Sequence, residues 1–191
     1  MYLATHGRPG PVFVEIPLDV QAEEIEPDSL KAFDSSEIKE KTFSLGSDLM
    51  KKIVQLLQEA KKPLFLAGNG IRLASGEEVL WKVLNKLKIN AATPIFTADD
   101  LVTYDYPYYL GRQGMPGNKA ANYAVDNCDL LLVIGERLQL TQTSFDYEKF
   151  AVQAKKIMVD IDANEMSKKT VKIDLPIHVD AKLFLEELYK Q

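Results

Sequence analysis

The run Gly68-Asn69-Gly70 combines residue types and a position that suit nucleotide binding. It follows an apolar stretch and precedes a helical pattern, so its backbone N–H groups can approach a pyrophosphate with no Cβ in the way. The dinucleotide fingerprint is incomplete, because its third glycine falls at Leu73 and no carboxylate closes the next predicted strand, 91–94. A conventional nicotinamide site is therefore not expected, and a tight strand-to-helix turn is the alternative interpretation.

Two acidic residues close a later predicted strand. Asp160 and Asp162 flank Ile161, so their side chains share one face and can accept hydrogen bonds from a ribose or an adenine. They can equally be helix-capping acids. Neither His6 nor His178 has a nearby nucleophile in a recognisable arrangement, so no catalytic residue and no metal ligand is predicted.

The segment 111–117 contains three glycines and a proline, which is too much glycine for a regular element. We expect a loop that wraps a ligand or a neighbouring domain, with a plain loop as the alternative. Cys128, before an apolar run, is expected to be a half-buried thiol. A group of tyrosines is expected to form a domain-contact surface rather than a binding site: Tyr104, Tyr106, Tyr108 and Tyr109.

The elements that would position these residues alternate along the chain. Short strands that are apolar throughout, separated by amphipathic helices, predict an α/β fold: a Rossmann-like doubly wound, mostly parallel sheet of about six strands with helices on both faces. In such a sheet, ligands bind outside the carboxyl ends of the strands. The predicted strands are 64–67, 91–94, 130–134, 156–161 and 173–179; helices are expected after Ser47, after a Ser75–Glu78 capping box, from Asn118 through Val125, and over 181–189.

The start of the chain is organised differently. A β-rich stretch, 12–16, stands between glycine and proline breakers and predicts a strand, although nothing before it can form its sheet. An acidic, aperiodic connector follows. We therefore predict three parts: residues 1–20 as a remnant of another domain, 21–46 as a linker, and 47–191 as the Rossmann-like domain.

Bulk composition excludes several classes of partner. The chain has 191 residues and a formal net charge of -5, with scattered basic residues, so no nucleic-acid or membrane partner is expected. Its single cysteine excludes an internal disulfide and fits a reducing, cytoplasmic setting. No apolar stretch approaches the roughly 20 residues that span a bilayer.

Several longer strings resemble acetolactate synthases and related thiamine-diphosphate enzymes. GRPGPVFVEIPLDVQ, at 7–21, is similar to the closing strand of their pyrimidine-binding domain and the start of the linker that leaves it. The other strings resemble their central domain: KKPLFLAGNGI at 61–71, YLGRQGMPGNKAANYAVDNCDLLLVIGERL at 109–138, KKIMVDIDANEMSK at 155–168 and LPIHVDAKLFLEEL at 175–188. In this order and spacing the resemblance covers nearly the whole chain.

The resemblance implies a domain that holds FAD in a structural role in acetolactate synthases, and an empty cleft or another nucleotide in many relatives. One departure weighs against FAD: the family usually continues after the equivalent of Arg137 with Phe-Asp-Asp-Arg, where this chain has Leu138-Gln139-Leu140-Thr141. Carried over by position, the implied cofactor contacts are Gly68, Asn69, Gly70, Gly114, Met115, Gly135, Arg137, Asp160, Ile161, Asp162 and Asp180.

The resemblance also implies what lies outside this sequence. Family members activate thiamine diphosphate with a glutamate of the pyrimidine domain and bind its diphosphate through Mg²⁺ with a Gly-Asp-Gly to Asn-Asn stretch, and Gly-Asp-Gly occurs nowhere here. We therefore expect a piece of a larger, homo-oligomeric enzyme that decarboxylates a 2-oxo acid such as pyruvate and passes the carbanion to an acceptor, the piece itself being inactive. A free-standing module that binds FAD or an adenine nucleotide is the alternative; a sirtuin-like or electron-transfer-flavoprotein-like role rests on fold alone.

Overall fold

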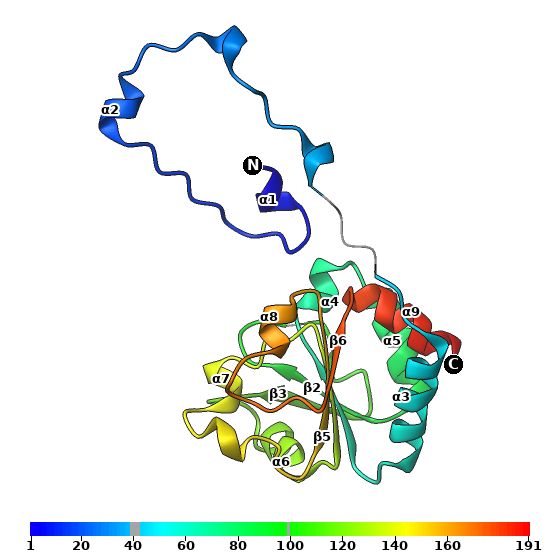
Figure 1. Cartoon of the computed structure of the whole chain (residues 1–191). Coiled ribbons are helices and arrows are strands. Elements are labelled where there is room, and N and C mark those ends of the chain that lie inside the picture. Colours follow the sequence, from blue (N-terminus) through cyan, green and yellow to red (C-terminus); the bar gives the residue numbers. More distant parts are fainter. Residues whose placement is uncertain (39–42, 99) are drawn as a thin grey trace. The chain divides into compact units, whose positions relative to one another are not determined.

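A computed structural model describes residues 1–38, 43–98 and 100–191 (Figure 1). The chain divides into two compact units, Met1–Thr42 and Phe43–Gln191. The first unit holds short helical turns: α1 (Tyr2–Thr5), α2 (Leu18–Gln21) and the 3₁₀ turns η1 (Pro27–Ser29) and η2 (Ser35–Glu37).

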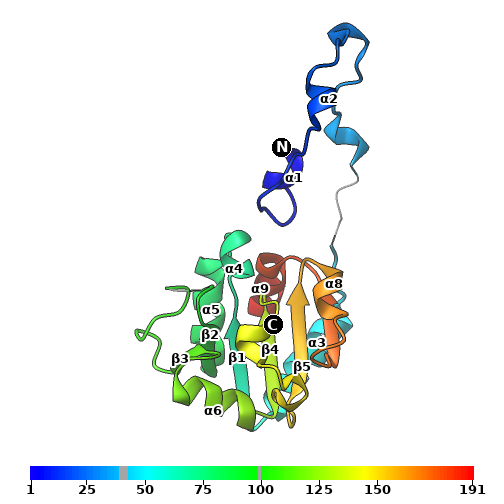
Figure 2. The ribbon, with the colours of Figure 1, turned by 90° about the vertical axis from the view of Figure 1, so that its left-hand side faces the viewer.

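The second unit is built on a six-stranded sheet in the order β3-β2-β1-β4-β5-β6, and every pair of neighbours is parallel. Figure 2 shows β3, β2, β1, β4 and β5 in this sequence across the sheet. The prediction of a doubly wound α/β fold is confirmed, and the chain order reverses between β1 and β4, where ligands bind in such sheets. The strands are β1 (Pro63–Ala67), β2 (Asn90–Pro94), β3 (Tyr109–Gln113), β4 (Leu130–Ile134), β5 (Lys155–Asp160) and β6 (Leu175–His178).

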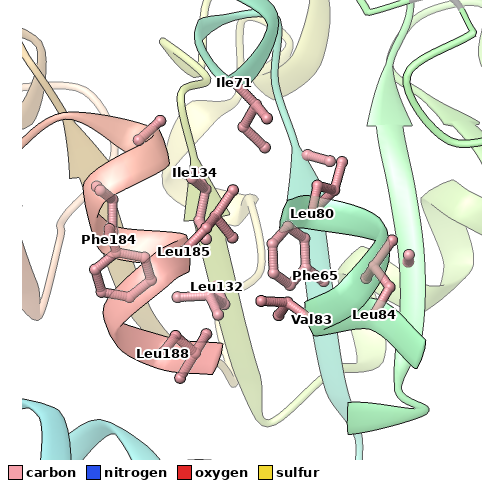
Figure 3. Packing of buried hydrophobic residues seen from close by; sticks show 14 of the residues in the cluster. Phe65, Ile71, Leu80, Val83, Leu84, Leu132, Ile134, Phe184, Leu185 and Leu188 are labelled. Atoms are coloured by element: carbon pink, nitrogen blue, oxygen red, sulfur yellow. The ribbon is translucent and has the colours of Figure 1, made fainter. Parts of the chain in front are cut away.

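The central strands are apolar throughout because each of their faces packs into a separate core. Along β4, Leu130, Leu132 and Ile134 enter one core, whereas Leu131 and Val133 enter the other. The first core is covered by α3, α5 and α9, and Figure 3 shows Phe184, Leu185 and Leu188 of α9 packed beside Leu132 and Ile134. The second is covered by α6 and the segment that follows β4. The helices of this unit are α3 (Ser47–Glu59), α4 (Gly70–Leu73), α5 (Glu77–Leu87), α6 (Lys119–Asn127), α7 (Leu140–Thr143), α8 (Ala163–Met166) and α9 (Ala181–Lys190), with a 3₁₀ turn, η3 (Tyr147–Lys149).

Two strand predictions were wrong. Residues 12–16 form no strand, and their side chains are exposed, Phe13 to 87%. A strand needs a hydrogen-bonded neighbour, and the described part of this unit contains no other strand. Conversely, β3 lies inside the segment expected to be a loop. Its sequence is polar and contains Gly111, but pairing with β2 satisfies its backbone and overrides the weak local preference.

The predicted helix caps also differ from the structure. Gly46, not Ser47, is the N-cap of α3, and Ser75 adopts φ 53°, so α5 begins after the N-cap Gly76 and has no capping box. Asn118 does precede α6, but its side chain accepts a hydrogen bond from the Arg112 N–H (2.7 Å) instead of capping the helix. The local sequence therefore predicted the helices, but contacts with the rest of the domain determine which residue caps each one.

Two side chains are buried more deeply than expected. Tyr106 is only 2% exposed, and its hydroxyl donates to the backbone oxygens of Leu84 (3.1 Å) and Ile89 (2.7 Å), so it belongs to the core and not to a contact surface. Cys128 is fully buried rather than half-buried, and its Sγ donates to the Val125 oxygen at 3.2 Å.

Candidate functional site

The parallel sheet gathers most of the predicted cofactor-binding residues at its carboxyl edge. Gly68 follows β1, Gly135 follows β4 and Asp160 closes β5, and these three strands are neighbours. Asp180 follows β6, which pairs with β5 through Asp160. Gly114 and Met115 lie elsewhere on this edge: they follow β3, which is separated from β1 by β2. The Met115 N–H donates to the Thr141 oxygen at 2.8 Å.

The glycines of the β1 turn lie directly against the turn after β4. A Cβ on Gly68 would lie 2.3 Å from the carbonyl oxygen of Gly135, and a Cβ on Gly70 would lie 2.7 Å from the Gly135 Cα. Gly135 itself has φ +62°. These contacts are shorter than real Cβ atoms allow, so glycine is required by packing between two loops.

The N–H groups of the two glycines in this turn are already used within the protein. Gly68 donates to the Ile134 oxygen and Gly70 to the Gly135 oxygen, both at 2.9 Å, so neither N–H points unpaired toward a ligand. A pyrophosphate at this edge would have to be held by other groups. The tight-turn interpretation therefore explains the two glycines without a ligand.

The acidic residues at this edge organise the loops that follow their strands. Oδ1 of Asp160 accepts from the Asp162 N–H (2.9 Å), and Oδ1 of Asp162 accepts from the Asn164 N–H (2.9 Å) as the N-cap of α8. Asp180 caps α9 through the Leu183 N–H at 3.1 Å. Helix capping, one of the two interpretations open for Asp162, is confirmed. The cofactor-binding role of these acids stays a prediction. The backbone oxygen of Ile161 lies 2.8 Å from His178 Nε2.

The sequence analysis assigned no role to Glu136, whose carboxyl group is buried. It is 4% exposed, and the Thr97 hydroxyl donates to its Oε2 at 3.4 Å. Burial raises the pKa of Glu136 to about 7, which hydrogen bonds from Arg137 and Thr97 partly oppose and the nearby Asp160 reinforces. The sequence signal for this site was position: Glu136 is the second residue after β4, the most apolar strand, and so lies at the carboxyl edge of the sheet.

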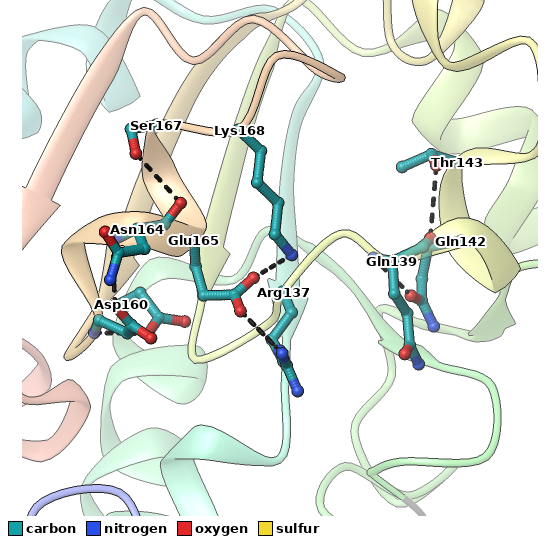
Figure 4. A network of polar contacts seen from close by, with 10 residues as sticks. Arg137, Gln139, Gln142, Thr143, Asp160, Asn164, Glu165, Ser167 and Lys168 are labelled. Atoms are coloured by element: carbon teal, nitrogen blue, oxygen red, sulfur yellow. Dashed lines mark hydrogen bonds and ion pairs between the residues drawn. The ribbon is translucent and has the colours of Figure 1, made fainter.

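Arg137, predicted to contact a cofactor, belongs to an ion network around Glu165. Its Nε donates to Oε1 of Glu165 at 3.0 Å and a terminal nitrogen lies 2.8 Å from the same oxygen, while Lys168 pairs with Oε2 (Figure 4). Burial acts to raise the pKa of Glu165, but the bonds from Lys168 and Arg137 outweigh it and lower that pKa. The Arg137 side chain is half exposed.

Gly114 and Met115 form a tight corner against α6 and α7. The Gly114 N–H donates to Oδ1 of Asn122 (2.9 Å), and the Asn122 amide donates back to the Gly114 oxygen (3.0 Å). A Cβ on Gly114, whose φ is +128°, would lie 2.6 Å from the Thr141 oxygen. The corner is therefore folded onto its own domain, with the Met115 side chain 46% exposed.

Comparison with known proteins agrees with this architecture. The family model for the central domain of thiamine pyrophosphate enzymes matches residues 50–188. The chain belongs to this family. The chain is 40% identical over 190 residues to a probable acetolactate synthase large subunit of Methanocaldococcus jannaschii, 36% identical over 197 residues to one of Methanococcus aeolicus, and 38% identical over 166 residues to the acetolactate synthase isozyme 2 large subunit of Escherichia coli.

These alignments cover 97%, 99% and 87% of this chain but only 31%, 31% and 29% of the three relatives. The chain thus corresponds to about a third of the length of each relative. No helix among the described residues has the length and apolar character needed to cross a membrane.

The described part of the central domain offers Mg²⁺ no cluster of several ligating side chains. Mg²⁺ binds a diphosphate together with carboxylate oxygens. In the described ranges 1–38, 43–98 and 100–191, no group of three or more His, Cys, Asp or Glu residues is arranged to hold a metal ion. The fit to the pyrophosphate of FAD is also poor, because the N–H groups of Gly68 and Gly70 are engaged and the buried Glu136 lies beside them.

Proposed function

We propose that this central domain is part of an enzyme that decarboxylates a 2-oxo acid such as pyruvate on thiamine diphosphate, with Mg²⁺, and joins the resulting carbanion to an acceptor. The observation that carries the proposal is the central-domain match over residues 50–188, supported by relatives named acetolactate synthase. When bound, thiamine diphosphate supplies the electron sink for loss of CO₂. The groups that hold it lie outside this domain.

The role of this domain is then structural. Its interlocked glycines at 68, 70 and 135 and its two cores make a rigid carboxyl edge on which neighbouring domains are placed. Residues 1–20, the linker 21–46 and the domain 47–191 form the proposed organisation. The exposed apolar side chains of Val12, Phe13, Val14 and Ile16 support it, since a strand in a neighbouring sheet would bury them.

The proposal extends to the cellular compartment and to the partners. A single buried cysteine that forms no disulfide fits a reducing, cytoplasmic compartment. We infer that the partners are the other domains of the parent enzyme, and that the full-length enzyme is a homo-oligomer.

A domain exchange tests the proposal. Residues 50–188 would replace the matched segment of the E. coli isozyme 2 large subunit, and acetolactate formation from pyruvate would be measured. We expect activity in this chimera, and none in a chimera that also carries Gly135→Val. A folded first chimera without activity would count against the proposal. The 191-residue chain alone, given thiamine diphosphate, Mg²⁺ and pyruvate, should release no CO₂; release would overturn the structural role.

A free-standing nucleotide-binding module is the second candidate. It is favoured by the reversal of chain order between β1 and β4, the usual ligand position in such sheets. Calorimetric titration of the chain with FAD, and separately with adenosine, tests it. Saturable binding would support the module, with adenosine preferred because it carries no pyrophosphate to meet Glu136. The absence of heat from both ligands at millimolar concentration would exclude it.

A further inference from the structure

The side chain of Glu136 spans the carboxyl end of the central strand β1. Glu136 follows β4 and Thr97 follows β2, and β1 lies between these two strands in the sheet. The hydrogen bond that the Thr97 hydroxyl donates to Oε2 of Glu136, at 3.4 Å, therefore joins loops on opposite sides of β1. At the end of β1 itself, a Cβ on Gly68 would lie 2.5 Å from the Glu136 Cβ. The side chain thus bridges the point where the chain order reverses, which is the usual ligand position in such sheets.

The Glu136 carboxyl also engages hydrogen-bond donors that an anionic ligand would need at this point. The backbone N–H of Arg137 donates to it, in addition to the Thr97 hydroxyl. Backbone N–H groups and hydroxyls of loops at strand ends are the groups that hold phosphates in many nucleotide-binding folds. With both donors engaged, neither is available to a phosphate.

The charges at this point also oppose an anion. Burial raises the pKa of Glu136 to about 7, so at pH 8 the carboxyl is mostly ionised. The nearby Asp160 reinforces the raised pKa, which places a second acid beside the first. Arg137 is the cation that acts on Glu136, and its guanidinium is already paired with Glu165 at 2.8 Å. A phosphate would therefore meet like charge.

Packing alone does not explain a carboxyl group at position 136. The residue is 4% exposed, and an apolar side chain of similar size would fill the same space without the loss of hydration that a charge suffers. Acids with strongly perturbed pKa values gather at functional sites. The carboxyl is explained if it has a role of its own at this edge.

We propose that Glu136 is a specificity-determining residue: its carboxyl takes the place of a ligand phosphate at the end of β1 and closes this domain to nucleotides that carry a pyrophosphate. Truncation of the side chain at Cβ would release the Thr97 hydroxyl and the Arg137 N–H and would open space beside Gly68. The proposal concerns only the ligand preference of this chain, so it does not depend on the reaction of the parent enzyme.

Calorimetric titration of the 191-residue chain with ADP at pH 8, without Mg²⁺, tests the proposal. Glu136→Ala should bind ADP at least about tenfold more tightly than the wild type, because the phosphate gains two donors and loses a like charge. Adenosine lacks the pyrophosphate, so the substitution should leave its affinity unchanged. Equal ADP affinity in the wild type and in a folded Glu136→Ala variant, or an equal gain for adenosine, would overturn the proposal.

A second substitution at the same position separates occupancy from charge. Glu136→Gln removes the charge but keeps the side-chain volume and an oxygen that can accept from Thr97 and Arg137. Its ADP affinity should therefore stay within about threefold of the wild type. A gain as large as that of Glu136→Ala would show that charge alone excludes ADP, and would refute occupancy by the side chain.

Further controls address folding and surface charge. Glu148→Ala removes an exposed acid and should leave ADP affinity unchanged; a gain there would mean that net charge, not Glu136, limits binding. Circular dichroism establishes that each variant is folded. Glu136→Ser replaces Glu136→Ala if the alanine variant does not fold. Tight ADP binding by the wild type would overturn the proposal without any variant.

Discussion

Gly68→Ala separates the two explanations for the glycines after β1. The new Cβ would lie 2.3 Å from the Gly135 oxygen and 2.5 Å from the Glu136 Cβ. Neither loop can yield easily, because Gly68 is bonded to the Ile134 oxygen and Gly135 to the Val159 oxygen, both at 2.9 Å. Overpacking of this kind costs about 1–3 kcal/mol. For a domain of this size, a loss of about 2 kcal/mol lowers Tm by roughly 4–8 °C.

Thermal and urea unfolding of the ligand-free chain, followed by circular dichroism, measure this loss. Gly10→Ala is the matched control, because a Cβ there meets nothing within 4 Å, and it should leave Tm unchanged. If the glycine serves only a ligand, Gly68→Ala would keep the wild-type Tm and lose nucleotide binding. An unchanged Tm would therefore refute the packing argument.

Three further predictions concern buried groups. Because burial raises the pKa of Glu136 from 4.5 to about 7, the folded state keeps a proton that the unfolded chain releases. The free energy of unfolding, measured by urea titration, should therefore fall by about 3 kcal/mol from pH 4.5 to 7 in the wild type relative to the Glu136→Gln variant. The control substitution Glu148→Gln, at an exposed position, should leave the wild-type pH profile unchanged. Arg137→Met removes one of the cations paired with the buried Glu165 and should lower the free energy of unfolding by about 1 kcal/mol. If urea unfolding shows no loss, the pair behaves as a surface ion pair. Burial raises the pKa of the Cys128 thiol to about 11, so Ellman's reagent at pH 8 should label it only upon unfolding, and fast labelling of the native chain would contradict its burial.

The sequence alone determined the fold class and much of the element order. Apolar strands at 64–67 and 130–134 lie within one residue of β1 and β4, because a strand covered on both faces is apolar at every position. The same logic places residues that follow these strands at one edge, since parallel strands end on the same side. Helices from 47, 119 and 181 follow from their apolar periodicity.

Only the tertiary structure decided what each of these residues does at that edge. The sequence suits Gly68 and Gly70 to a phosphate, yet the turn after β4, more than sixty residues away in the chain, occupies the space beside them. The strand β3 and the missing strand at 12–16 show the same dependence: one exists because β2 pairs with it, and the other lacks a neighbour among the described residues. The raised pKa of Glu136 likewise comes from burial between loops that sequence spacing does not bring together. Local patterns determine which element a segment prefers, but backbone pairing, close contact and desolvation depend on residues distant in sequence.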